Sequence, residues 1–230
     1  MGDEALYHEA TEGRSGLAHG MAEAEGRARG IYARWGKRAL DLLLVIAAAP
    51  IVAPVVFLLA LLVRRDGGPA FYSQERVGMG GKRFRCWKLR TMVPDAEARL
   101  ARLLESDPEA AREWRERQKL RRDPRVTRIG AFLRKSSLDE LPQLWNVLRG
   151  EMSLVGPRPF LPEQEELYPG TAYYALRPGL TGYWQVGDRN DSSFAARAVH
   201  DARYAREISL AADVATILRT VGVVLRQTGC

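Results

Sequence analysis

An uninterrupted apolar segment near the start of the chain constrains the fold more than any other feature of the sequence. Residues 42–63 read LLLVIAAAPIVAPVVFLLALLV, 22 positions without a charged side chain. About 20 apolar residues are enough for a helix to cross the hydrocarbon core of a bilayer. A surface helix of a soluble protein is polar on one face, whereas this segment is apolar all round. The sequence therefore predicts that the segment enters a membrane.

Two prolines and the flanking charges argue against a simple crossing. Pro50 and Pro54 lie in the middle of the segment, where proline removes a backbone hydrogen bond and kinks a helix. Positive charge favours the cytoplasmic side of a membrane. Basic residues lie on both flanks: Arg34, Lys37, Arg38, Arg64 and Arg65. We therefore expect residues 31–66 to form a re-entrant helix, broken at Pro50, that enters and leaves the same leaflet; a kinked single span is the alternative.

Asp41 is the acidic residue next to the apolar segment. Lys37 and Arg38 precede it by four and three positions, the separations at which side chains on a helix are neighbours. We expect Asp41 to pair with one of these cations or to lie at the membrane interface.

The rest of the chain has the composition of a basic globular protein. Its 230 residues are 46% apolar and 27% charged, which fits one domain with an appendage and excludes a wholly disordered chain. Residues 1–30 carry three arginines against six acids, and we interpret them as a disordered leader. Removing their −3 from the total of +7 leaves +10 on residues 31–230. Such a body favours anionic lipid or phosphorylated substrates as partners; nucleic acid is not expected, because no base-reading motif is present.

The remaining pattern predicts an α+β fold that is mostly helical, with a small β-hairpin or sheet. Residues 71–77 and 82–92 flank the glycines at 78–81 and predict a hairpin. Residues 95–121 are charge-rich and helical, with Pro108 at the start of a second helix. A further helical pattern begins at Ser137, and residues 194–226 predict a C-terminal helix.

Asp139 and Glu140 are adjacent acids at the predicted start of a helix. Ser137-x-x-Glu140 matches a capping box, and acids favour helix N-termini, so a structural role is the simpler interpretation. Their basic neighbours favour chemistry: Arg134 precedes the pair, and Arg158 lies between two prolines that fix its loop. Arginine held in this way suits bidentate recognition of phosphate. The combination indicates phosphoryl chemistry with Mg²⁺, which binds one or two carboxylates together with substrate phosphates.

An aromatic pair further along offers a surface for a nucleotide. Trp184 and its neighbour Tyr183, with Arg189, provide the stacking groups that nucleotide recognition needs. Arg177 and Gln185 are assigned with Trp184 and Arg189 to a nucleotide-binding site. A place for Trp184 in the core is the alternative.

Four stretches of the chain carry specific motifs. They are KRALDLLLVIAAAPIV, QERVGMGGKRFRCWKLRTM, RIGAFLRKSSLDELPQLWNVLRGEMSLVGPRP and RPGLTGYWQV. With them, about residues 34–230 resemble the monotopic phosphoglycosyl transferases, also called bacterial sugar transferases. The run from SLDELPQLWNVL to SLVGPRP is the most specific, and the C-terminal part is most similar to the exopolysaccharide-priming members.

The resemblance implies an activity, a location and roles for individual residues. Members transfer a sugar-1-phosphate from a UDP-sugar to undecaprenyl phosphate and release UMP, at the cytoplasmic face of the bacterial inner membrane, with Mg²⁺ as cofactor. Asp139 matches the nucleophile that forms a phosphosugar intermediate, and Glu140 its partner; both are implied near the metal. Arg134 and Arg158 match phosphate-contacting arginines, and Lys88 matches the basic position of the KLRTM stretch. Residues 67–230 are then expected to form the catalytic domain on the cytoplasmic face.

Two other functions stay open on the sequence. In the first, the lipid phosphate attacks the UDP-sugar directly and Asp139 only binds Mg²⁺. In the second, the chain is a non-catalytic, membrane-anchored factor for polysaccharide assembly. The expected partners are a UDP-sugar, undecaprenyl phosphate and inner-membrane lipids; the identity of the sugar and the oligomeric state, a homodimer included, are left open.

Overall fold

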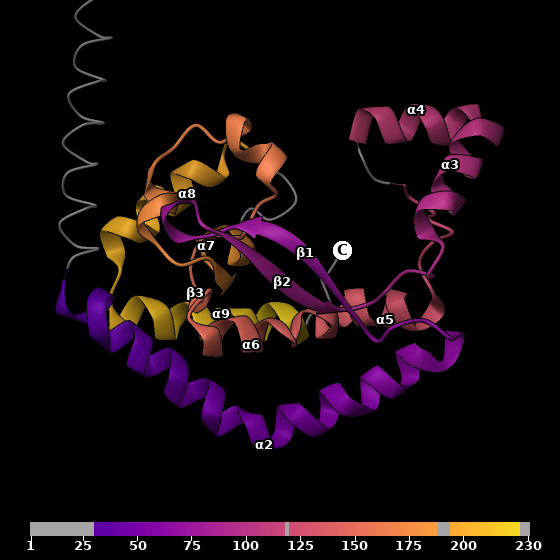
Figure 1. Cartoon of the computed structure of the whole chain (residues 1–230). Helices are drawn as coiled ribbons and strands as arrows, with labels where there is room; N and C mark the ends of the chain where they lie inside the picture. Colours follow the sequence, from indigo (N-terminus) through magenta and orange to yellow (C-terminus); the bar gives the residue numbers. More distant parts are fainter. Residues whose placement is uncertain (1–29, 118–119, 188–193, 226–230) are drawn as a thin grey trace, which may run out of the picture. The chain divides into compact units, whose positions relative to one another are not determined.

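The computed structural model describes residues 30–117, 120–187 and 194–225. Residues 1–29 of the predicted leader, and Arg189, lie outside this part of the chain. The described residues form an α+β fold that is mostly helical, with two small sheets, as predicted (Figure 1).

The elements follow one another along the chain with short connections. The α-helices are α2 Lys37–Val63, α3 Ala96–Ser106, α4 Pro108–Arg117, α5 Arg128–Ser136, α6 Gln143–Arg149, α7 Tyr183–Val186, α8 Arg197–Glu207 and α9 Leu210–Leu225. The π and 3₁₀ turns are η1 Tyr32–Gly36, η2 Arg64–Asp66, η3 Met79–Gly81, η4 Leu138–Glu140, η5 Pro162–Leu167 and η6 Ala172–Ala175. The strands are β1 Phe71–Val77, β2 Arg83–Leu89, β3 Ser153–Val155 and β4 Gly179–Thr181.

Helix α2 contains the apolar segment. It runs for 27 residues with Pro50 and Pro54 inside it, so the helical backbone continues through the positions where a break was expected. Within the described residues, Tyr32–Asp66 is the one helical segment long and apolar enough to cross a membrane, and only 11% of its most apolar window is buried. The helix is therefore compatible with a membrane anchor.

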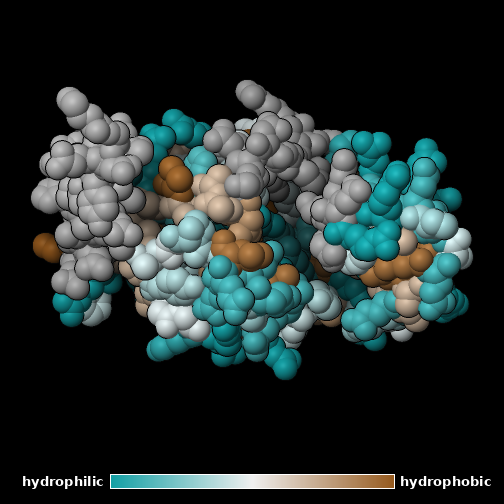
Figure 2. All heavy atoms as spheres, turned by 90° about the horizontal axis from the view of Figure 1, so that it is seen from above, coloured by the Kyte–Doolittle hydropathy of each residue, from teal (hydrophilic) through white to brown (hydrophobic). Residues whose placement is uncertain are grey.

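The apolar side chains of α2 are unusually exposed for a protein in water. Those with at least half of their surface exposed are Leu43, Ile46, Ile51, Phe57, Leu58 and Leu61. By contrast, the face seen in Figure 2 is largely hydrophilic, with apolar side chains in small separate patches. A surface of this kind on α2 needs a nonpolar environment.

The predicted hairpin and the predicted helix pair are confirmed. Strands β1 and β2 pair around η3, where Gly80 and Gly81 have φ of 68° and 75°, a region that glycine enters without strain. Helix α4 begins at Pro108, as expected. The predicted C-terminal helix is instead two helices, because Ile208 between α8 and α9 has an extended ψ of 115°.

The chain folds into two compact units. The first contains the described parts of Met1–Ala48, Gln74–Cys86 and Gln143–Val223, and the second those of Ala49–Ser73, Trp87–Pro142 and Val224–Cys230. A cluster in the first unit includes Phe84, Cys86, Val147 and Met152, packed on Val45 of α2. In the second unit, Leu59, Ala60 and Val63 of α2 pack with Ala70, Leu89 and Leu133. Each unit therefore has a core that includes part of α2.

A short parallel sheet organises the first unit. Strands β3 and β4 pair in parallel, with Ser153 opposite Gly179 and Val155 opposite Thr181. A Cβ added at Gly156, Gly179 or Gly182 would collide with backbone atoms, so glycine is required for this close approach. The sequence pattern did not predict this pairing, because strands of three residues are too short to show an alternation. The sheet places the loop after β3 next to the start of α7.

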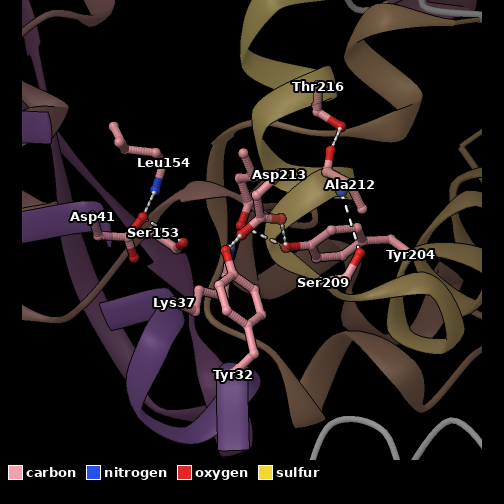
Figure 3. Close-up of polar contacts among 11 residues, drawn as sticks. Tyr32, Lys37, Asp41, Ser153, Leu154, Tyr204, Ser209, Ala212, Asp213 and Thr216 are labelled. Atoms are coloured by element: carbon pink, nitrogen blue, oxygen red, sulfur yellow. Dashed lines mark hydrogen bonds and ion pairs between the residues drawn. The ribbon is translucent and has the colours of Figure 1, made fainter. Parts of the chain in front are cut away.

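A buried polar network ties the start of α2 to α9 in the first unit (Figure 3). Asp213 is fully buried. Its carboxylate accepts hydrogen bonds from Lys37 Nζ at 2.7 Å, Tyr32 Oη at 2.7 Å and Tyr204 Oη at 2.6 Å. Asp41 accepts instead from the Leu154 backbone N–H at 2.9 Å and the Ser153 hydroxyl at 3.1 Å. The prediction that Asp41 pairs with Lys37 or Arg38 is therefore wrong. Lys37 forms its ion pair with Asp213, which is distant in sequence.

Candidate active site

Helix α5 of the second unit carries the first predicted site residue, Arg134. A Cβ at Gly130 would collide with the backbone of Thr91, so the glycine lets α5 lie directly on that segment. Thr127 caps the helix by accepting from the Gly130 backbone N–H at 2.9 Å. One turn after Gly130, Arg134 Nε donates to Thr91 Oγ1 at 2.9 Å. The close approach therefore fixes where the Arg134 guanidinium lies.

Ser137 ends α5 in an unusual backbone conformation. Its φ of 56° is the only positive φ among the described non-glycine residues. It is followed by η4, which contains Asp139 and Glu140, and the Ser137 side chain makes no capping hydrogen bond. The capping box expected as the simpler interpretation is therefore wrong: Ser137 caps the C-terminus of α5. Strained residues of this kind concentrate at functional sites.

Asp139 is a buried acid without a strong partner. Its side chain is 8% exposed. No side chain of another described residue donates a hydrogen bond to its carboxylate or forms an ion pair with it. Burial raises the pKa of Asp139; the charge of Lys88 opposes this shift, Glu140 adds to it, and Arg134 opposes it. The carboxylate is thus desolvated and held near two cations without being bound by either.

Glu140 differs from its neighbour because it is paired. Lys88 Nζ, on β2, donates to Glu140 Oε1 at 2.7 Å. Burial lowers the pKa of Arg134, and the charge of Asp139 opposes that shift. The second unit therefore brings together four of the predicted residues: Lys88, Arg134, Asp139 and Glu140.

The donor set of this acidic pair fits a hard cation. Within the described residues, no group of three or more His, Cys, Asp or Glu side chains is placed to hold a metal. Mg²⁺ does not need one, because it binds one or two carboxylates and completes its shell with water and substrate phosphates. Asp139 and Glu140 supply that minimum.

The first unit contains Arg158, in the loop after β3. Prolines at 157 and 159 fix the loop, and the Val77 backbone N–H donates to the Phe160 carbonyl at 3.1 Å. Arg76 of β1 donates to the Pro159 carbonyl at 3.5 Å. The loop thus carries one arginine and is contacted by a second.

Three of the four predicted nucleotide residues lie in the described part of this unit. Arg177 Nε donates to the Gly150 carbonyl at 3.1 Å. Trp184 and Gln185 are both buried on α7, and Arg189 lies outside the described residues. The face of Trp184 is covered by Arg197 of α8, whose guanidinium carbon is 4.1 Å from the ring centroid. Sequence reasoning missed Arg76 and Arg197, because a lone arginine on a strand or helix carries no local signal.

Comparisons with known proteins identify the family of this chain. The bacterial sugar transferase family matches residues 32–227. The chain is 48% identical over 198 residues to the UDP-galactose-lipid carrier transferase of Erwinia amylovora, which covers 85% of this chain and 42% of that protein. It is 46% identical over 198 residues to the undecaprenyl-phosphate galactose phosphotransferase of Salmonella typhimurium, with coverages of 85% and 42%.

A third relative is close to this chain in length. The exopolysaccharide production protein ExoY of Sinorhizobium fredii is 45% identical over 196 residues, which cover 84% of this chain and 87% of that protein. The chain therefore spans less than half of the first two relatives and most of the third. With the family match extending over both units, the chain belongs to the bacterial sugar transferase family.

Proposed function

We propose that the protein transfers a sugar-1-phosphate from a UDP-sugar to undecaprenyl phosphate and releases UMP, as the first membrane step of exopolysaccharide or glycoconjugate synthesis. The names of the relatives support the lipid carrier, the sugar-phosphate transfer and the exopolysaccharide product. The residue chemistry of the second unit supports the mechanism.

Asp139 acts as the nucleophile in the first step. One of its carboxylate oxygens attacks the phosphorus that bears the sugar. The bond from this phosphorus to the bridging oxygen breaks, and the electron pair leaves with that oxygen on UMP. The sugar-1-phosphoryl group is then held on Asp139 as an acyl phosphate, which divides one difficult transfer into two easier ones.

The lipid acts in the second step. A phosphate oxygen of undecaprenyl phosphate attacks the same phosphorus, and the bond to the Asp139 oxygen breaks. The products are the lipid-linked sugar diphosphate and the restored carboxylate. Arg134 and Arg158 are assigned to phosphate groups, since arginine binds them in a bidentate manner.

The single observation that carries the proposal is the state of Asp139. A nucleophilic carboxylate must be ionised and accessible to phosphorus. Asp139 is 8% exposed and has no side-chain partner among the described residues. Burial raises its pKa, and the charges of Lys88 and Arg134 act against this shift and favour the ionised form. Asp139 and Glu140 are the residues that would hold Mg²⁺, which, when bound, neutralises part of the diphosphate charge.

The location is part of the proposal. We assign residues 31–66 to a re-entrant segment in the cytoplasmic leaflet of the bacterial inner membrane, supported by the exposed apolar surface of α2 and the basic flanks. Single cysteines at Ile31 and Arg65, with native cysteines replaced by serine, are expected to react with an impermeant maleimide from the same side. Labelling from opposite sides would establish a single span instead.

The activity is tested by UMP release. Purified protein is mixed with undecaprenyl phosphate, Mg²⁺ and a panel of UDP-sugars that includes UDP-galactose and UDP-glucose. We expect release with at least one sugar, dependent on the lipid for sustained turnover. No release with any sugar, from folded protein in a bilayer, would favour the non-catalytic assembly factor.

A further inference from the structure

Two buried donors in the first unit have no acceptor among the described residues. One is Nε2 of Gln185, a side chain that is 7% exposed, and the other is Nε of Arg197. Buried polar groups in native proteins are nearly always hydrogen-bonded. Two such donors in one unit indicate an acceptor that the described residues do not supply.

The Arg197 guanidinium is held in place by aromatic rings. Its central carbon lies 4.1 Å from the centroid of the Trp184 ring and 4.8 Å from that of Phe194. Stacking fixes the plane of a guanidinium while its N–H groups remain directed outward along the edge. Gln185, which carries the second donor, follows Trp184 on α7.

Further positive charge is gathered around Arg197. Burial is the main cause that lowers the pKa of Arg197 to about 10, and the charges of Arg158 and Arg76 lower it further. The acid near Arg197 is Asp201, which accepts from the Tyr168 hydroxyl at 2.8 Å. Burial raises the pKa of Asp201 to about 7, so this acid only partly offsets three arginines near neutral pH.

We propose that Arg197 and Gln185, together with Arg158 and Arg76, form a binding site for a phosphate ester, with Arg197 Nε–H and the Gln185 amide as direct donors. The inference deepens the proposed function and rests on it for the identity of the ligand. The phosphate belongs either to the diphosphate of the UDP-sugar or to the headgroup of the polyprenyl phosphate. A phosphate group has enough acceptor oxygens for several fixed N–H donors.

Binding to the full chain in nanodiscs tests the proposal without requiring turnover. The probes are UDP, uridine and polyprenyl phosphate, and the variants are Arg197→Lys and Gln185→Met. Lysine keeps the charge but lacks the planar group and the Nε–H; methionine keeps the approximate volume of Gln185 without its amide. The matched control is Arg203→Lys, an exposed position on the same helix that pairs with Glu207 at 2.9 Å.

We expect Arg197→Lys to weaken the binding of one phosphate ligand by about tenfold or more, and Gln185→Met by about threefold to tenfold. Uridine binding and the Arg203→Lys control are expected to change by less than about twofold. Loss confined to UDP identifies the donor phosphate, and loss confined to polyprenyl phosphate identifies the acceptor phosphate; either result supports the site.

Three results would overturn the inference. They are unchanged binding of both phosphate ligands in the two variants, an equal loss for uridine and UDP, and no binding of any phosphate probe by the unmodified protein. If Arg197→Lys lowers the melting temperature, the binding measured with Gln185→Met decides whether the site exists. The proposed function alone is contradicted if UDP binding depends on Arg197 but the protein transfers no sugar phosphate. This inference alone is contradicted if transfer is normal and both variants bind the phosphate ligands as the unmodified protein does.

Discussion

Asp139 and Asp213 are both buried aspartates, but they differ in their hydrogen-bond partners. Asp213, in the first unit, accepts hydrogen bonds from Lys37, Tyr32 and Tyr204 (Figure 3). Asp139, in the second unit, is 8% exposed and has no side-chain partner among the described residues. Its neighbour Glu140, rather than Asp139, takes the nearby lysine.

The difference separates a structural acid from a reactive one. A carboxylate whose oxygens all accept strong hydrogen bonds is stabilised in place and has no lone pair available for attack. A carboxylate that is desolvated near cations, without a hydrogen bond from another side chain, is destabilised in the resting protein and suited to bond formation. Burial of the Asp139 carboxylate costs stability, whereas the hydrogen bonds of Asp213 connect the start of α2 to α9.

Replacing the reactive acid has the largest expected effect on activity. Asp139→Asn keeps the shape but removes the nucleophile, so UMP release should fall by about 10³-fold or more. The melting temperature should not fall, because the side chain makes no strong interaction that Asn loses. Near-normal UMP release from the folded variant would refute the nucleophile assignment.

Replacing the structural acid should have the opposite pattern. Asp213→Asn leaves the Lys37 ammonium buried without its counter-charge, which costs about 3–5 kcal/mol of unfolding free energy. Activity per folded molecule should be retained. In the double variant Lys37→Met/Asp213→Asn both charges are gone, and much of the lost stability should return; a double variant as unstable as the sum of the singles would mean that the ion pair is not the source of the effect.

Removing the cation beside the reactive acid tests how Asp139 stays ionised. The charge of Lys88 holds the pKa of Asp139 down against burial. Lys88→Met should therefore shift the acidic limb of the UMP-release profile to higher pH and lower the rate near neutral pH by about tenfold. Arg99→Met, which removes an exposed cation of α3 that pairs with Asp95, is the control. A profile that falls without shifting would assign Lys88 to substrate binding only.

A pH dependence of stability is expected from Asp201, another buried acid. Burial raises the pKa of Asp201 from 3.8 to about 7. Between these values the folded protein holds a proton that the unfolded chain has released, so this contribution to stability is complete below about pH 4 and is lost as pH rises through about 7. The loss is at most about 1.4 kcal/mol per pH unit. Asp201→Asn lacks this proton release. As pH rises from about 4 to about 7, the variant should therefore become more stable relative to the unmodified protein, as measured by the free energy of unfolding. A difference in unfolding free energy that stays constant with pH would contradict the assignment.

Features with a strong local signal could be predicted from the sequence. The glycines between β1 and β2 predicted the hairpin, Pro108 predicted the start of α4, and the charge-free segment predicted α2. The acid–arginine pattern around Asp139 identified Arg134, Asp139 and Glu140, whereas Lys88 was assigned only through the family resemblance. These predictions rest on short-range chemistry that a single segment contains.

Features that depend on distant partners could not be predicted. Lys37 pairs with Asp213 across 176 positions, so the local rule for Asp41 failed. Ser137 and Glu140 have the spacing of a capping box, but Ser137 has a positive φ and makes no capping hydrogen bond, and Glu140 pairs with Lys88 instead. Arg197 is recognisable as a candidate site residue only from its stacking on the Trp184 ring. In each case tertiary contacts determined the outcome and overrode a correct local pattern.

Isotope exchange tests the central claim, that Asp139 carries the sugar phosphate, most directly. The protein is incubated with a UDP-sugar that it accepts and radiolabelled UMP, in the absence of polyprenyl phosphate. We predict that label enters the UDP-sugar, because the first step is reversible without the lipid, and that Asp139→Asn abolishes this exchange. Absence of exchange from a preparation that transfers the sugar phosphate once lipid is added would contradict the covalent mechanism and establish direct displacement.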